Sequence, residues 1–119
     1  MKIRGGRGNK YRAKVSGCQH GHVHPSIREA NRCNQLHLLV RAGEIVDLVR
    51  EPQFWFSING VQVKHLNGRR VGYKGDFGYT DVATGRHVVE DAKGVSVRDY
   101  VLRIAIARAM FPHIDFREV

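Results

Sequence analysis

The sequence lacks any run of about 18 apolar residues, which is the minimum for a membrane-spanning helix. Its first residues also lack the apolar core of a signal peptide. Only two cysteines are present, Cys18 and Cys33, and without an export signal a reducing compartment is expected, where paired cysteines more often bind metal or stay as thiols. We therefore expect a cytoplasmic, intracellular protein without a membrane partner.

Acidic residues are absent from residues 1–14, although the whole chain carries a net charge of +9. The cations of this segment are Lys2, Arg4, Arg7, Lys10, Arg12 and Lys14. Three glycines lower its order and no apolar stripe is present, so we interpret it as a flexible basic arm that binds a polyanion, most simply nucleic acid. The alternative is a solvated tail that only aids solubility.

The chain has no internal repeat, and its 119 residues suffice for one domain, which we place at residues 15–119. A capping-box pattern at Ser26 and Glu29 and a glycine at Gly43 predict a helix over residues 26–42. Further predicted elements are an irregular or edge strand at 45–58 with Pro52 inside it, strands at 61–66, 71–82, 86–93 and 114–119, and a helix at 97–111. This order indicates an α/β sandwich with a mixed sheet.

The second helix is predicted from residues at helical spacing, and we expect them to form its apolar stripe. They are Val97, Tyr100, Val101, Ile104 and Ala105.

Two neighbouring charges end the strand predicted at 86–93. The period of two places Asp91 and Lys93 on one face with Val89, whereas Glu90 faces the other way. A turn at residues 84–85 joins this strand to the one before it, so Asp76 and Asp91 are expected to converge from neighbouring strands. Two adjacent carboxylates repel one another unless a cation lies between them, and Mg²⁺ is the natural candidate. The alternative for Asp91 and Lys93 is a surface ion pair.

A third acid, Glu29, lies on the face of the first helix that carries its apolar residues. An acid in that position is unusual. It either joins the other two acids or only closes the capping box with Ser26.

The succession of a helical Glu29, a strand Asp76 and then "DAK" at residues 91–93, followed by a helix and a strand, resembles the PD-(D/E)xK nuclease superfamily. That superfamily includes restriction endonucleases and phage-type Holliday-junction endonucleases. A family of small phage-encoded proteins in it is more similar still, through the segments "NKYRAK", "SIREANRCNQLHLLVRAGEI", "YKGDFGY", "VVEDAKG" and "FREV". The resemblance implies a restriction-endonuclease-like α-β-β-β-α-β core with a mixed central sheet.

The resemblance also implies roles for the acids. Asp76 and Asp91 would bind Mg²⁺ or Mn²⁺, together with the carbonyl of Ala92, and Glu29 would be a further ligand directly or through water. Lys93 would orient or activate the attacking water.

This sequence departs from the family pattern in having Gly75, where a proline is usual, before Asp76. We expect the change to matter little, because the acid does the chemistry. If the strand register slips by one residue, Glu90 becomes the inward acid, but Lys93 then no longer shares its face.

A phage or prophage protein of this kind would act on DNA in replication or recombination, and structure-selective cleavage of branched DNA and a homodimer are both left open. Hydrolysis fits the residues, because bound metal stabilises the attacking and leaving oxygens. Arg69 and Arg70, at a predicted loop tip, are candidate phosphate contacts.

A second group of metal-ligand types lies in "GCQHGHVHPS", residues 17–26. In an extended chain its Cys and His residues would face one way, and on the first helix Cys33 and His37 are one turn apart. The candidate ligands of a structural Zn²⁺ are Cys18, His20, Cys33 and His37, with His22 as the substitute. The spacing matches no common zinc finger, so the histidines have phosphate contact as an alternative role.

Three functions remain in competition. The first is a metal-dependent DNA endonuclease, and the second is a non-catalytic, zinc-stabilised DNA-binding protein in which the acids are structural. The third, an RNA-binding accessory protein, has less support because the aromatic residues form no recognisable stacking motif. The joint presence of Glu29, Asp76, Asp91 and Lys93 favours the first.

Overall fold

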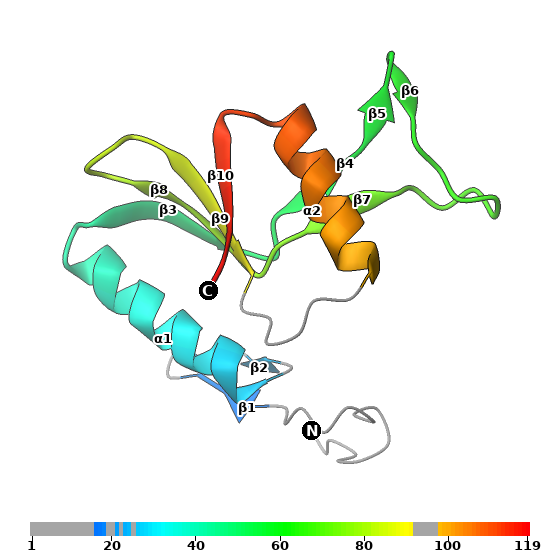
Figure 1. Ribbon diagram of the computed structural model, residues 1–119. Helices are drawn as coiled ribbons and strands as arrows, with labels where there is room; N and C mark the ends of the chain where they lie inside the picture. The colour runs from blue at the N-terminus through cyan, green and yellow to red at the C-terminus, as the bar shows by residue number, and fades with distance from the viewer. Residues whose placement is uncertain (1–15, 19–20, 22, 25, 92–97) are drawn as a thin grey trace.

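A computed structural model describes residues 16–18, 21, 23–24, 26–91 and 98–119 of the chain, and these form an α/β fold with two helices (Figure 1). The elements are β1 Ser16–Gly17, β2 Val23–His24, α1 Ile27–Arg41, β3 Ile45–Arg50, β4 Gln53–Trp55, β5 Ser57–Ile58, β6 Val61–Gln62, β7 Gly72–Lys74, β8 Phe77–Asp81, β9 His87–Asp91, α2 Arg98–Met110 and β10 Ile114–Glu118. The basic arm predicted at residues 1–14 lies outside the described residues.

The central sheet has the strand order β10-β9-β8-β3. β3 pairs with β8 and β8 with β9 in antiparallel fashion, whereas β9 and β10 are parallel. A parallel pair needs a long crossover connection, which here contains α2. The predicted α/β class and mixed sheet are confirmed. Elements α1, β3, β8, β9, α2 and β10 follow one another in that order, with β4 to β7 inserted between β3 and β8.

Helix α1 follows its sequence signals closely. The Ser26 side chain caps it by accepting a hydrogen bond from the Glu29 N–H at 3.1 Å. At the other end Gly43 adopts φ +76°, the left-handed conformation that lets the chain leave a helix. Neither α1 nor α2 is long and apolar enough to cross a membrane, and these are the helices of the described residues.

The sheet carries a different core on each face. On the face toward α1, which we call the α1 face, Cys33 and Leu36 pack with Val88 and Phe77. On the opposite face, the α2 face, Tyr73, Val89 and Phe116 pack with Tyr100, Ile104 and Ala107. Strand β9 therefore contributes alternate residues to the two cores, as the period of two requires.

The segment predicted as one irregular or edge strand is divided in the structure. β3 is an edge strand of the sheet, with a register irregularity between Val46 and Val49 and a positive φ of 57° at Asp47. Beyond Pro52 the chain leaves this sheet, because β4 pairs with β7 and β5 with β6. The turn predicted at residues 84–85 is confirmed, with a positive φ at Gly85, and Asn59 and Gly60, also at positive φ, form the turn between β5 and β6.

The predicted apolar stripe of the second helix is confirmed in part. Tyr100, Ile104 and Ala107 are buried, whereas Val101 and Ala105 are exposed. The buried spacing of four and then three residues follows one helical face, and Val101 is turned about 100° away from it. Val97 lies outside the described residues.

Candidate functional site

Asp76 and Asp91 lie opposite each other where the neighbouring inner strands β8 and β9 of the central sheet begin and end. The register of β8 and β9 pairs Phe77 with Glu90, so the residue before Phe77 faces the residue after Glu90. The Asp76 N–H donates to the Glu90 carbonyl at 2.8 Å, which extends the pairing to this point. The structure thus brings the two aspartates to neighbouring strand ends, as the sequence predicted.

Asp91 belongs to the α2 face, where its side chain is fully buried (0% exposed). The Tyr73 hydroxyl donates a hydrogen bond to Asp91 Oδ2 at 3.3 Å. Burial raises the pKa of Tyr73 above its ordinary value, and the negative charges of Asp91 and Asp76 raise it further. Tyr73 therefore stays a neutral hydrogen-bond donor at physiological pH, held close to both carboxylates.

Glu90 points the opposite way, to the α1 face, and is also fully buried. Arg32 of α1 donates two hydrogen bonds to the Glu90 carboxylate, from Nε to Oε1 at 2.7 Å and from Nη2 to Oε2 at 2.6 Å. The Tyr79 hydroxyl donates to Oε2 as well. The assignment of opposite faces to Glu90 and Asp91 is therefore confirmed, whereas Lys93 and Ala92 lie outside the described residues.

Both hydrogen-bond partners of Glu90, Arg32 and Tyr79, have raised pKa values. The hydrogen bond to Glu90 is the main cause that raises the pKa of Arg32. Burial, followed by the bond to Glu90, raises the pKa of Tyr79 to about 12. Arg32 was not predicted as the partner of Glu90. The available signal was that Glu90 alternates with Val88 on a covered face, where an acid requires a cation.

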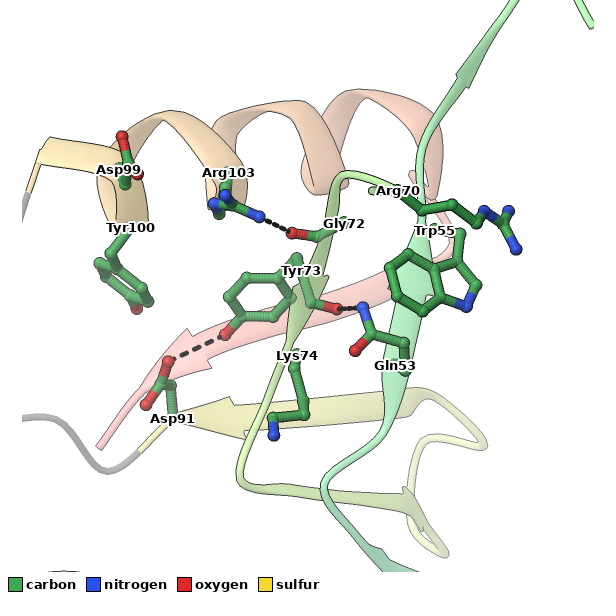
Figure 2. A pocket seen from close by; sticks show the side chains of 10 residues that line it. All are labelled: Gln53, Trp55, Arg70, Gly72, Tyr73, Lys74, Asp91, Asp99, Tyr100 and Arg103. Atoms are coloured by element: carbon green, nitrogen blue, oxygen red, sulfur yellow. Dashed lines mark hydrogen bonds between the residues drawn. The ribbon is translucent and has the colours of Figure 1, made fainter. Parts of the chain in front are cut away.

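A cavity of about 350 Å³ opens on the α2 face beside Asp91 (Figure 2). Figure 2 shows Asp91 and Trp55 on either side of Tyr73. The residues that line the cavity are Gln53, Trp55, Arg70, Gly72, Tyr73, Lys74, Asp91, Asp99, Tyr100 and Arg103. Its volume is within the range of about 300–1,000 Å³ that is usual for small-ligand sites.

Cations and aromatic rings dominate the wall of this cavity. The Arg70 guanidinium lies over the Trp55 ring, with Cζ 4.7 Å from the ring centroid, and Arg103 donates to the Gly72 carbonyl at 2.7 Å. Lys74, next along β7, is exposed. Trp55, Lys74 and Arg103 were not predicted as site residues, although residues 53–75 contain four Lys and Arg and no acid.

Arg69 and Arg70 lie at the loop tip where they were predicted, and both are exposed. An isolated bridge pairs Lys64 with Arg70, and the Arg69 N–H donates to Asn67 Oδ1 at 2.9 Å. A second cavity of about 660 Å³ borders this tip, and Arg69, Arg70 and Arg103 are among its lining residues. Basic groups of the loop tip and of α2 therefore border the same cavity.

Glu29 is buried near the start of α1, next to the Ser26 cap. No group of three or more His, Cys, Asp or Glu side chains placed to hold a metal ion is found within the part of the chain that the structure describes. The role of Glu29 as a further ligand to the metal at Asp76 and Asp91 therefore remains a prediction.

Three of the zinc candidates come from the described residues, and they lie at one place on the α1 face. Cys33 Sγ lies 3.7 Å from His37 Nδ1, and that nitrogen lies 2.9 Å from the Cys33 carbonyl oxygen. Burial raises the pKa of Cys33 to about 12, and a hydrogen bond with Cys18 contributes to the rise. The two cysteines are not joined by a disulfide. His20 and His22 lie outside the described residues, so zinc binding stays a prediction.

Gly75 proves to be required by its surroundings. Its N–H donates to the Pro52 carbonyl at 3.0 Å, and a Cβ at this position would lie 2.5 Å from Val89 Cγ1. A proline has neither the N–H nor the space. The glycine before Asp76 therefore follows from the local packing of this chain.

Residues 8–119 match the family described as "Protein of unknown function (DUF1064)", and the chain belongs to that family. No curated protein and no solved structure matches the chain.

Proposed function

For this member of the DUF1064 family, we propose a metal-dependent DNA endonuclease that hydrolyses phosphodiester bonds. The observation that carries the proposal is the pairing of Asp76 and Asp91 at adjacent strand ends, with Asp91 lining a cavity rich in cations. The chain order α1, β3, β8, β9, α2, β10 is the order that the resemblance to PD-(D/E)xK nucleases implies, and it supports the same proposal.

The donor set suits Mg²⁺ or Mn²⁺. Mg²⁺ in enzymes is commonly held by one or two carboxylates, with substrate phosphates and water completing its shell. Asp76 and Asp91 would supply the carboxylates, with Glu29 and the Ala92 carbonyl as further ligands. A bound metal of this type stabilises negative charge on phosphate oxygens.

The remaining groups of the site act on the substrate and on the acids. Tyr73 fixes the orientation of Asp91 through its hydrogen bond to Oδ2. Arg70, Lys74 and Arg103 attract the DNA backbone to the cavity, because cations at such a surface release counterions from the phosphates. Lys93 is assigned the activation of water, and residues 1–14 and Arg69 the retention of DNA.

A cleavage assay with linear, flap and four-way DNA, with and without Mg²⁺, tests the proposal. We expect cleavage that requires the metal and is lost in Asp91→Asn, while Asp115→Asn serves as the matched control. Asp115 is on β10 and forms a surface ion pair with Arg117, so its loss should not alter the rate. Metal-independent cleavage, or equal activity of the two variants, would refute the assignment.

The second candidate is a non-catalytic DNA-binding protein stabilised by zinc. This candidate is favoured by the close packing of three possible zinc ligands, Cys18, Cys33 and His37. Tight DNA binding without cleavage of any of the three substrates, in either Mg²⁺ or Mn²⁺, would select this candidate.

A further inference from the structure

Trp55 occupies an unusual position for the single tryptophan of the chain. It is 43% exposed, and it lines the same cavity as Asp91. In the β4–β7 pair it lies opposite Gly72, where an added Cβ would lie 2.9 Å from the Trp55 ring. Because Gly72 has no side chain, it leaves room for the indole.

The Arg70 guanidinium stacks over this ring. With the guanidinium in place Trp55 still keeps 43% of its surface exposed, so part of the indole is open to the cavity. The segment around it, residues 53–75, has no acid, and Lys74 and Arg103 line the same cavity. An aromatic surface among cations suits a ligand with a flat ring and a phosphate.

We propose that the cavity takes an unpaired nucleotide of the DNA substrate, whose base stacks on Trp55 while Arg70 and Lys74 hold the neighbouring phosphates. This rests on the proposed nuclease function and gives it a substrate class. In the interior of a duplex both faces of each base are covered by neighbouring bases, so there only an unpaired or flipped nucleotide can present a face to the indole. Asp91 on the other side of Tyr73 then places the reactive groups close to the point where pairing ends (Figure 2).

Because Trp55 is the single tryptophan of the chain, its fluorescence reports directly on this site. We would titrate the full chain in EDTA with a single-stranded oligonucleotide and with a blunt duplex of equal length, and follow tryptophan fluorescence. Stacking predicts strong quenching by the single strand and little by the duplex. Equal quenching by both, or none by the single strand, would overturn the proposal.

Affinity measurements on variants, by anisotropy of labelled DNA, give an independent readout. Base–aromatic stacking is worth enough that Trp55→Leu should weaken single-strand binding about 5- to 150-fold. Duplex binding, which depends on phosphates, should change less than about twofold. Trp55→Phe should restore part of the loss, and Ile58→Ala, at an exposed site on the β5–β6 hairpin, should change neither affinity. An equal loss for both DNA forms in Trp55→Leu would contradict base stacking.

The outcome can be separated from that of the nuclease proposal, because binding in EDTA needs no cleavage. Quenching by single strands without cleavage of any substrate would uphold the nucleotide site and reject the nuclease. Metal-dependent cleavage without quenching or single-strand preference would uphold the nuclease and reject the nucleotide site.

Discussion

Glu90 and Asp91 are adjacent, fully buried acids, but their surroundings on the two faces of β9 differ. On the α1 face Glu90 is enclosed by Arg32 and Tyr79, which engage both of its oxygens. On the α2 face Asp91 lines a cavity, opposite Asp76. Burial alone therefore does not identify a reactive acid. An acid neutralised within the protein supports the fold, whereas one that borders a cavity can serve a substrate.

The sharpest test of this contrast is Asp91→Asn. We expect cleavage to fall by about 100- to 1,000-fold, since a carboxylate ligand to the metal contributes several kcal/mol to the transition state. The asparagine has the same shape and still accepts from Tyr73, so the free energy of unfolding should change by less than about 1 kcal/mol. Initial rates on branched DNA and urea denaturation measure the two quantities. Normal cleavage by this variant would remove Asp91 from the site.

The opposite pattern is expected for Glu90→Gln. Loss of the acid leaves Arg32 partly buried and unpaired, which should cost about 3 kcal/mol of stability, the lower end for a broken buried pair. The lower end applies because Arg32 keeps 25% of its side-chain surface exposed. The cleavage rate per folded molecule should stay within about twofold of wild type.

The double variant Arg32→Met/Glu90→Met is the control, since replacing both charges with apolar groups should recover most of the stability. A stable but inactive Glu90→Gln protein would show that the roles of the two acids are exchanged.

A third prediction concerns the metal candidates of the α1 face. We expect the purified protein to carry about one zinc per chain, and Cys18→Ser or Cys33→Ser to lose it together with about 2 kcal/mol of stability. Cleavage per folded molecule should be affected far less than in Asp91→Asn, because this site lies on the other face. Elemental analysis of protein prepared without chelators decides the point, and absence of zinc would contradict it.

The smallest expected effect is on the pH dependence of stability. Tyr79 has its pKa raised from 10.0 to about 12, so between these values the folded protein retains a proton that the unfolded chain has lost. Its contribution to stability is therefore complete below pH 10 and is lost as the pH rises through 12. In Tyr79→Phe the fall in stability over this window should be shallower by about one proton per molecule.

Cys33 and Tyr73 also have raised pKa values, so part of the slope should persist in the Tyr79→Phe variant. Denaturation curves at several pH values give the difference. An unchanged slope would mean that Tyr79 ionises alike in the folded and unfolded states.

Local patterns allowed much of this fold to be predicted. The Ser26 cap and Gly43 define α1 within a residue, and strand alternation assigned Glu90 and Asp91 to their correct faces. Both signals act over a few residues, where steric and hydrogen-bonding rules decide the outcome.

What could not be predicted depends on residues far apart in the chain. Arg32 and Glu90 are 58 positions apart, and no local rule pairs them. The cavity between Trp55 and Asp91 exists only because β4 to β7 leave the sheet after Pro52, a change of partner that the strand propensity of residues 45–58 does not reveal. Metal binding and cleavage remain predictions.

Gly75 has a consequence for how sequences can diverge around this site. Because its N–H bonds to Pro52 and its missing side chain makes room for Val89, the three positions form one steric unit. A homologue with proline at position 75 must therefore carry a smaller residue at 89 and a different course of the chain at 52. Residues at these three positions should therefore co-vary among homologues. A sequence search that requires proline before the aspartate would overlook chains in which glycine allows this packing.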